Sequence, residues 1–251
     1  MDQFEKTFRT ITSIIFGKEL TGYKDYGQWL SHDVSEMEKV KSALSEDVVY
    51  LPKQFQFYQD VQSRIITFNE AYDVHGKKQL DESRLNLLSL KNAGKTLKDI
   101  SLTTMDTFYG QNSNLVECSL YYNSHSCYQG IALVSSKCCL YSFWPRQSEY
   151  MIGCYYCFSC SFSIKCYNSE NLTRCFEVSD STNCTDSYFC YNCENLSNCM
   201  FCFNTKSKRY AIANVEVGRE KYIEIKKKFL GELLKTLERD KKLDISIFHL
   251  Y

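Results

Sequence analysis

The hydrophobic and polar positions of this chain follow two different periods, which change near residue 100. In the first part, apolar residues recur at the spacing of an amphipathic helix. One such face begins close to the start of the chain and consists of Phe4, Phe8, Ile11 and Ile15. This spacing predicts a helix that packs its apolar side against another part of the protein.

Three further helices are predicted before residue 100. The spacing places one from Val34 to Leu44 and another from Phe55 to Phe68. Asp81 is suited to cap a fourth helix, because its carboxylate can accept hydrogen bonds from the first free amide groups. That helix is expected to carry Leu85, Leu88 and Leu90. Residues 1–100 are therefore expected to form a helical region, and they contain no cysteine.

Beyond residue 100, small and aliphatic residues occupy every third position. Thirteen of the 14 cysteines share this register, and only Cys138 is out of phase. The thirteen are Cys118, Cys127, Cys139, Cys154, Cys157, Cys160, Cys166, Cys175, Cys184, Cys190, Cys193, Cys199 and Cys202. Serine and leucine fill most of the other places in the register. Neither a strand, with a period of two, nor a helix, with a period of 3.6, explains this spacing.

Asparagine favours the position just before these small residues. Asn tolerates the left-handed backbone conformation better than most residues, so it suits a tight corner. A buried thiol behaves as a small hydrophobe and suits a crowded axis. Residues 101–213 therefore predict a narrow parallel β-solenoid with an inward Cys/Ser ladder. The segment from Cys166 to Cys175 recurs from Cys190 to Cys199, which fits two coils of about 12 residues each.

The last part of the chain, residues 214–251, predicts a capping helix and a short strand. Residues 219–240 have one apolar side, formed by Tyr222, Ile225, Phe229, Leu233 and Leu237. Residues 244–251 alternate like a strand. Because the open ends of a solenoid expose backbone groups and core, we expect the helical segments on both sides to cap them. The predicted fold class is thus α+β.

Charge and composition exclude several classes of protein. The 30 basic and 30 acidic residues cancel, so the net charge indicates neither nucleic acid nor a membrane as partner. No stretch of about 18 apolar residues is present to span a membrane. The first residues lack a basic segment followed by an apolar one, so no secretory signal is expected. A cytoplasmic or virion protein with reduced thiols is the prediction.

Zinc binding is the main alternative use of the cysteines. Cys190, Cys193, Cys199 and Cys202 form two CxxC pairs with spacings typical of zinc sites. A zinc site does not explain why nine further cysteines share the register, whereas a solenoid does. We therefore expect a structural ladder and no cofactor, with zinc as the alternative.

Other uses of the cysteines find less support in the sequence. Disulfides would require a secreted protein. The Asn-x-Ser/Thr sequences at Asn171, Asn183 and Asn195 follow from the repeat itself. His125 lies two residues before Cys127, so a coil of period three points the two side chains in opposite directions and forms no catalytic pair.

An aromatic residue often follows the inward one. Stacked coils would align these rings as a ladder on an outer face, formed by residues that include Tyr155, Phe158, Tyr167, Phe176, Tyr188, Tyr191 and Phe203. Two interpretations stay open. The helices at the start of the chain cover this face, or it is an exposed docking surface, since Tyr and Phe are enriched at interfaces. Single-strand binders combine such rings with basic residues, which are few here, so nucleic acid is not expected.

The solenoid and its exit resemble a family of uncharacterised Cys/Asn-rich repeat proteins from candidate-phyla bacteria and large tailed phages. The resemblance covers residues 115–225. Its most specific parts are the stretch from Asp186 to Cys202, the phrase Lys208-Arg-Tyr210-Ala-Ile212-Ala-Asn214 and the helix opening Glu220-Lys-Tyr222. Val215-Glu216 replaces the Lys-Gln that usually follows the phrase, and helices replace a zinc-ribbon-like front. In lacking the zinc-ribbon-like front, the sequence resembles the phage members of the family. The resemblance implies a solenoid fold and no known activity.

The sequence predicts a non-enzymatic structural or interaction protein, a component of a phage particle or its assembly. It would form oligomers or bind protein partners through the aromatic ladder and the helix at 219–240. If the ladder is the docking face, Tyr188 and Tyr191 should contribute to assembly and not to the fold. The alternative function is a zinc- or redox-responsive thiol module. An enzyme of unknown class, with a cleft between helices and solenoid, is a third hypothesis.

Overall fold

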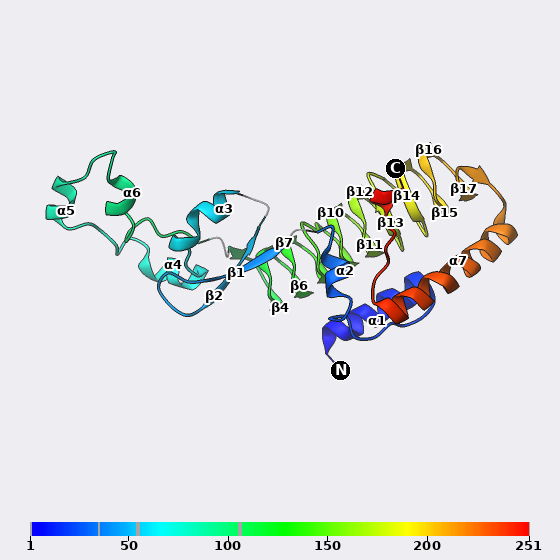
Figure 1. Ribbon diagram of the computed structural model, residues 1–251, viewed down its shortest axis with the longest axis horizontal. Coiled ribbons are helices and arrows are strands. Elements are labelled where there is room, and N and C mark those ends of the chain that lie inside the picture. The colour runs from blue at the N-terminus through cyan, green and yellow to red at the C-terminus, as the bar shows by residue number, and fades with distance from the viewer. Residues whose placement is uncertain (1, 35, 54–55, 105–106, 251) are drawn as a thin grey trace. The chain divides into compact units, whose positions relative to one another are not determined.

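The protein divides into two compact units. The computed structural model describes residues 2–34, 36–53, 56–104 and 107–250. Residues 1–35 and 110–251 form the solenoid unit, and residues 36–109 form the insert unit. This division differs from the expected one at residues 100 and 214, because the first helix and the last helix both belong with the solenoid (Figure 1).

The insert unit contains short elements around a small core. They are β1 (Met37–Lys41), β2 (Val48–Pro52), α3 (Gln56–Val61), η1 (Gln62–Arg64), α4 (Phe68–Val74), α5 (Glu82–Asn86), α6 (Ala93–Thr96) and β3 (Phe108–Tyr109). The helix predicted over residues 34–44 is wrong. Val40 pairs with Val49 in an antiparallel hairpin, and burial of β2 side chains with Ile65 favours the strand over the helical spacing.

Two other predicted helices of the insert unit are found in shortened form. In place of the helix predicted from Phe55 to Phe68, the chain forms α3 and η1 and leaves the helical conformation after Arg64, because Ile65 and Ile66 are buried in extended backbone. Phe55 lies outside the described residues. The cap at Asp81 is confirmed, since its Oδ1 accepts a hydrogen bond from the Arg84 amide at 2.8 Å. Helix α5 ends at Asn86, so Leu88 and Leu90 lie beyond it.

The solenoid unit begins with two helices, continues with stacked strands, and ends with a long helix and a short 3₁₀ turn. The elements are α1 (Gln3–Phe16), α2 (Gly27–Ser31), β4 (Ser113–Val116), β5 (Ser119–Tyr122), β6 (His125–Tyr128), β7 (Ile131–Val134), β8 (Lys137–Leu140), β9 (Glu149–Ile152), β10 (Tyr155–Phe158), β11 (Ser161–Ile164), β12 (Tyr167–Glu170), β13 (Phe176–Ser179), β14 (Tyr188–Glu194), β15 (Ser197–Met200), β16 (Phe203–Lys206), β17 (Arg209–Ile212), β18 (Val215–Glu216), α7 (Arg219–Asp240) and η2 (Ile247–His249).

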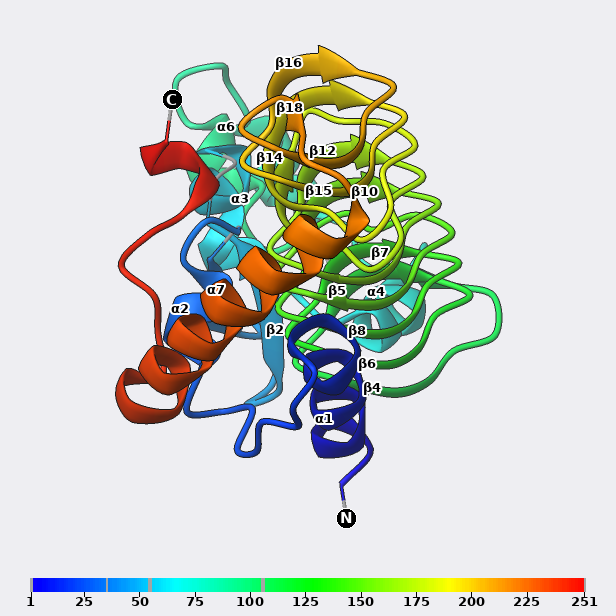
Figure 2. The same cartoon turned by 90° about the vertical axis from the view of Figure 1, so that its right-hand side faces the viewer.

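The coil length predicted from the repeat is confirmed. Parallel pairs join equivalent residues of successive coils at that interval, as Tyr155 pairs with Tyr167 and Phe176 with Tyr188. Figure 2 shows the stacked coils, with α1 and α7 outside them. A residue and its equivalents in the other coils therefore form a column along one side of the solenoid.

Every coil turns at a corner on each third position. From Asn114 to Ala213, each third residue has a positive φ, and Gly153 is the one glycine in this series. The asparagines predicted at corners lie in it, but so do bulky residues such as Trp144 and Phe162. A positive φ costs a non-glycine residue about 1–2 kcal/mol, so the contacts between coils have to offset this strain.

Hydrogen bonds between coils satisfy the backbone, and the inward side chains take part. The amide of a corner residue donates to a carbonyl of the preceding coil, as Gln147 does to Val134 at 2.9 Å. The amides of several inward residues turn into the core and donate to a side chain one coil earlier. Cys154 donates to Ser142 Oγ at 3.3 Å and Cys193 to Ser181 Oγ at 3.0 Å, while the Leu172 amide meets the Cys160 thiol. Serine and cysteine are thus small acceptors as well as small fillers.

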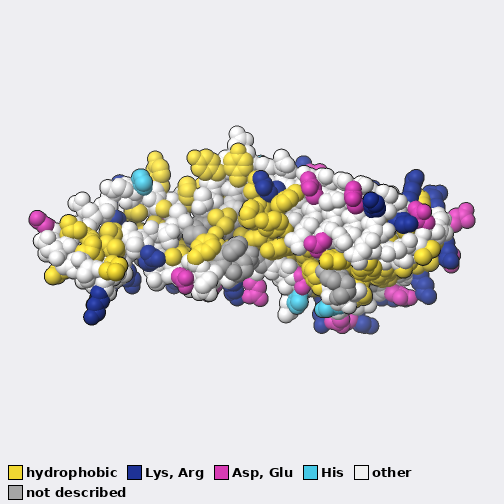
Figure 3. Space-filling model, turned by 90° about the horizontal axis from the view of Figure 1, so that it is seen from above, with side chains coloured by type: hydrophobic (Ala, Val, Ile, Leu, Met, Phe, Trp, Pro, Cys, Tyr) yellow, Lys and Arg dark blue, Asp and Glu magenta, His cyan; other side chains and the backbone are white. Residues whose placement is uncertain are grey.

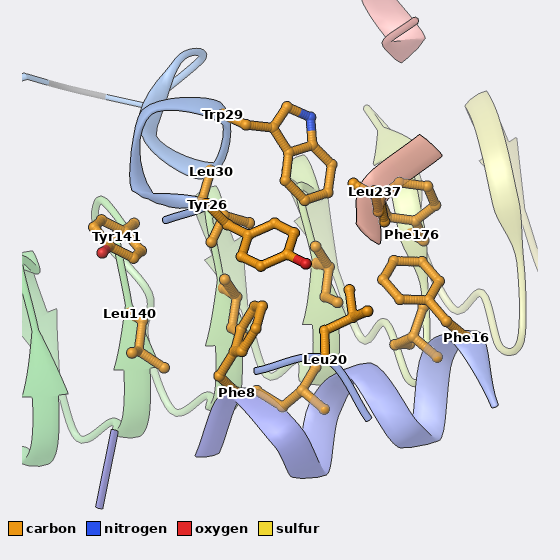
Figure 4. Packing of buried hydrophobic residues seen from close by; sticks show 14 of the residues in the cluster. Phe8, Phe16, Leu20, Tyr26, Trp29, Leu30, Leu140, Tyr141, Phe176 and Leu237 are labelled. Atoms are coloured by element: carbon orange, nitrogen blue, oxygen red, sulfur yellow. The ribbon is translucent and has the colours of Figure 1, made fainter. Parts of the chain in front are cut away.

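A second hydrophobic core lies outside the coils, where α1 and α7 cover one side of the solenoid. Helix α1 lies along β6, β8, β9 and β11, and α7 contacts β17. Column residues such as Leu140 and Phe176 meet Phe8, Phe16 and Leu237 of the two helices (Figure 4). The side predicted for α1, with Phe4, Phe8, Ile11 and Ile15, is buried here. Helix α1 therefore covers a side of the solenoid and not its end.

The last coil is closed mainly by side chains. Asn214 uses both atoms of its amide on Phe203: Nδ2 donates to the carbonyl at 2.8 Å, and Oδ1 accepts from the backbone amide at 2.9 Å. Strand β18 turns back antiparallel onto β17. The strand predicted over residues 244–251 is wrong, because Ile247–His249 form a 3₁₀ turn whose apolar side chain is buried in the outer core.

We predict that Ser181→Ala destabilises the solenoid by about 1–3 kcal/mol, because it leaves the buried amide of Cys193 without an acceptor. Ser187→Ala is the matched control, since the Ser187 hydroxyl donates to the Thr185 carbonyl, which keeps the Asn198 amide as a partner. The midpoints of denaturant unfolding measure the stability of the two variants. Equal midpoints for the two variants would contradict the role given to inward acceptors.

Candidate functional site

The inward thiols are bonded to the backbone that surrounds them. All 14 cysteines are free and buried. Cys190, Cys193, Cys199 and Cys202 each donate to the carbonyl two residues earlier, at 3.3 to 3.6 Å. Burial raises the pKa of the Cys175 thiol far above its ordinary value, so this thiol stays protonated and unreactive.

Neither alternative use of the cysteines gains a site from the geometry. Among the described residues, no three His, Cys, Asp or Glu side chains are placed to hold a metal ion. Zinc therefore stays an alternative that rests on spacing alone. His125 is exposed and pairs with Ser113, whereas Cys127 is fully buried.

The predicted aromatic ladder is split between two different environments. The rings do not form one column, because the corners divide each coil into four sides. Tyr167, Phe176 and Tyr188 are at most 2% exposed. Tyr155, Phe158, Tyr191 and Phe203 are half-buried. Both interpretations of the ladder thus describe part of it: helices cover some rings, and others reach the surface.

Tyr188 belongs to the covered part and contributes to the fold. Its hydroxyl donates to the carbonyl of Ile15 in α1 at 2.8 Å, and Lys226 of α7 lies 4.3 Å from its ring centre. Tyr188 therefore joins both helices to the solenoid. The expectation that Tyr188 serves assembly and not the fold is wrong for this reason.

The helix predicted as an interface uses its apolar side within the solenoid unit. Tyr222, Leu233 and Leu237 are buried, and Ile225 and Phe229 pack against the same core. The Phe229 ring lies 5.2 Å from that of Phe201. In this structure α7 is a cover for the solenoid, and its buried residues present no surface to a partner.

A group of aromatic residues forms a continuous surface on two neighbouring coils. We call Trp144, Tyr155, Tyr156 and Phe158 the aromatic patch; all four are half-buried. The ring of Tyr156 is 5.0 Å from that of Trp144 and 5.4 Å from that of Phe158. The exposed Arg146 guanidinium lies 5.6 Å from the Phe158 ring centre, within the range of a cation–π contact.

One column of corner residues holds α2 and the segment after α7 against the solenoid. Gly153, Lys165 and Glu177 occupy the same corner in three successive coils. Gly153 has φ +64°, and a Cβ atom there would lie 2.5 Å from the Leu30 carbonyl oxygen, so only glycine allows α2 to come this close. Lys165 binds the end of α2, and Glu177 binds the segment after α7.

Lys165 and Glu177 form a buried cluster of titratable groups with Asp33. Lys165 Nζ donates to Asp33 Oδ2 at 2.9 Å and to the Trp29 carbonyl at 3.3 Å. It lies 3.9 Å from Glu177 Oε1, and both side chains are at most 2% exposed. Glu177 Oε2 accepts a hydrogen bond from the Ile247 amide at 2.8 Å. The cluster thus attaches the end of α2 and the segment after α7 to one corner of the coil.

The environment changes the pKa values of both carboxyl groups. Burial raises the pKa of Glu177 to about 7, although the nearby Lys165 charge opposes this. Burial also raises the pKa of Asp33, but the hydrogen bonds and charges of Lys165 and His32 outweigh it and leave that pKa below its ordinary value. Glu177 therefore takes up a proton near neutral pH, and Asp33 stays ionised beside Lys165.

A cleft of about 510 Å³ opens beside this cluster. Its walls come from the region of α2, from Lys165 and from the segment after α7. The residues that line it are Asp25, Gln28, Trp29, His32, Asp33, Lys165, Asp240, Lys241, Lys242, Leu243, Asp244, Ile245, Ser246 and His249. Its lining includes both aspartate and lysine side chains, so the cleft has no strong preference for one sign of charge.

Neither the corner column nor the cleft was identified from the sequence. The sequence predicts that corner positions favour asparagine, but it does not predict that corner residues contact other segments. A signal was present in principle, since Gly153, Lys165 and Glu177 recur at the interval of one coil among corners that carry mostly neutral residues. Their role depends on α2 and Ile247, which are far away in the sequence.

Comparison of the sequence with protein-family models and with curated proteins finds no match. In the part of the chain that the structure describes, no helix is both long and apolar enough to cross a membrane.

We predict that Gly153→Ala destabilises the protein by about 1–3 kcal/mol, since the added Cβ combines a strained φ with a collision against the Leu30 carbonyl. Gly231→Ala in α7 is the control. It has no atom within 4 Å of its added Cβ and should stabilise the helix by about 0.5–1 kcal/mol. Thermal unfolding of the two variants should therefore shift in opposite directions, and a shift in the same direction would contradict the close contact of α2.

We predict that Glu177 makes the protein less stable as the pH rises from 4.5 to about 7. The folded chain holds the Glu177 proton over this range and the unfolded chain does not, so the favourable contribution is complete below 4.5 and is lost as the pH passes the folded value. Relative to Glu177→Gln, which cannot ionise, the wild-type protein should lose up to about 3 kcal/mol across this range. Chemical denaturation at several pH values measures the free energy of unfolding of the wild type and of Glu177→Gln. The same pH dependence of this free energy in the two proteins would contradict the prediction.

Proposed function

We propose that this chain is a non-enzymatic interaction protein that docks protein partners, including further copies of itself, through the aromatic patch. The observation that supports the proposal is the position of Trp144, Tyr156 and Phe158. These rings touch one another and remain partly exposed, outside the hydrophobic cluster that α1 and α7 cover.

The chemistry of the aromatic patch is that of a protein-binding hot spot. Trp, Tyr and Arg are the residues most enriched at such positions, because they combine a large apolar area with a polar group. Arg146 supplies a charge beside the Phe158 ring. Tyr156 and Phe158 lie in β10, and parallel bridges from Phe143 to Tyr155 and from Arg146 to Phe158 join it to the coil of Trp144, so little conformational entropy is lost on binding.

The insert unit offers a second apolar surface that supports the same function. Leu85, Leu87 and Leu90 are 56%, 72% and 99% exposed. Hydrophobic side chains reach the surface of both units in the view of Figure 3. Exposed apolar residues close together are typical of interaction sites.

The finer assignment, to the assembly of a phage particle, rests on the resemblance of the solenoid and its exit phrase. Within that proposal the protein acts in the virion or in the cytoplasm during assembly. A zinc- or redox-responsive module stays the alternative, and it rests on the CxxC spacing of Cys190, Cys193, Cys199 and Cys202.

We predict that the double substitution Trp144→Ser and Tyr156→Ser weakens self-association more than tenfold, because each hot-spot ring contributes over about 1 kcal/mol. Tyr72→Ser, which changes a tyrosine that is 80% exposed in the insert unit, is the matched control. Sedimentation velocity over a range of concentrations measures the association constants.

Two results would contradict this proposal in different ways. Equal association constants for the double variant and Tyr72→Ser would remove the aromatic patch as the contact. A wild-type chain that stays monomeric at every concentration would remove the homo-oligomer.

A further inference from the structure

The segment that follows α7 lies on the solenoid and has contacts of its own. We call residues 241–250 the strap. Ile247 is fully buried, its amide donates to Glu177 Oε2 at 2.8 Å, and the Phe248 ring lies 4.7 Å from the ring of Tyr167. The turn around Ile247 contacts β13 and β14. A few adjacent residues thus hold the strap in a groove of the solenoid.

The groove has the properties of a peptide-binding site. It recognises one backbone amide through the Glu177 carboxylate, one aliphatic side chain through burial and one ring through Tyr167. The other oxygen of the Glu177 carboxyl group, Oε1, lies 3.9 Å from Lys165 Nζ on the solenoid. Because Glu177, Tyr167 and Lys165 all belong to the solenoid, the site is independent of how the strap is connected to α7.

The connection between α7 and the strap begins at Lys241, whose amide donates to the Leu237 carbonyl at 3.0 Å and whose Nζ donates to the Tyr26 hydroxyl at 3.3 Å. Leu243 packs against the outer core. Lys241 has φ +58°, in the left-handed region that a non-glycine residue rarely adopts. Lys242, Asp244 and Ile245 are partly or fully exposed. The Lys242–Asp244 ion pair lies within the strap and moves with it. Opening this hinge relieves the left-handed backbone at Lys241 and breaks the contacts of Lys241 and Leu243, which form again when a second chain supplies the strap.

We propose that the groove also binds the strap of a second copy of the chain, so that two copies exchange straps in a symmetric dimer. The segment known to fit the groove is the strap itself, and each contact of Ile247 and Phe248 forms equally well between two chains as within one. Strap exchange then requires only that the hinge opens and that the copies meet. This inference concerns a different surface from the aromatic patch and does not rest on it.

Isotope-labelled full-length chains test the exchange directly. A photo-reactive phenylalanine analogue replaces Phe248, which is 37% exposed, and therefore lies beside Tyr167. Equal amounts of ¹⁴N and ¹⁵N protein are mixed, equilibrated at high concentration and irradiated. Mass spectrometry then identifies peptides that join the strap to the segment around Tyr167. In a fully exchanged dimer, about half of these cross-links should contain one chain of each isotope.

Two variants separate strap exchange from docking at the aromatic patch. Ile247→Ala should speed the appearance of mixed cross-links at least about tenfold, because the buried side chain that holds the strap is truncated. The Trp144→Ser and Tyr156→Ser double variant should leave the mixed fraction unchanged, even if it abolishes docking through the patch. Cross-links of a single isotope at every concentration, in the wild type and in Ile247→Ala alike, would overturn the proposal.

Discussion

The hydrogen bond from an inward amide to a serine or cysteine in the preceding coil is the contact on which this structure depends. A corner at every third residue turns that amide into the core, where backbone acceptors of the next coil do not reach it. Only a small side chain with an acceptor atom both fits the axis and bonds to the amide. The same geometry explains the period of three and the preference for Ser and Cys.

Because the inner side chains stabilise the coil, its outer positions are free to vary and determine what covers each side. Where Leu140 and Phe176 form an apolar column, α1 and α7 lie across it. Where Lys165 and Glu177 occupy a corner, they bind α2 and the strap through charges and backbone groups. The solenoid is thus a uniform support, and the particular side chains of each column decide its contacts.

The period of three, the coil length and the helix at residues 219–240 could be predicted because each depends on neighbours in sequence. The segment around Val40 is a strand instead of a helix because it pairs with Val49, which spacing within one segment does not reveal. The ladder could not be divided into covered and exposed rings, since the register does not tell which of four sides meets α1. Lys165 and Glu177 were missed for the same reason: their partners, Asp33 and Ile247, are distant in the sequence and belong to other elements.

The amide side chain of Asn214 has a consequence for how copies of this protein can be arranged. With one donor and one acceptor on Phe203, it takes the place that a peptide group of a further coil would occupy. A second solenoid approaching this end meets, at Phe203, an amide and a carbonyl whose bonding capacity is already used. Growth by stacking coil upon coil, as in a fibre, is therefore opposed at this position.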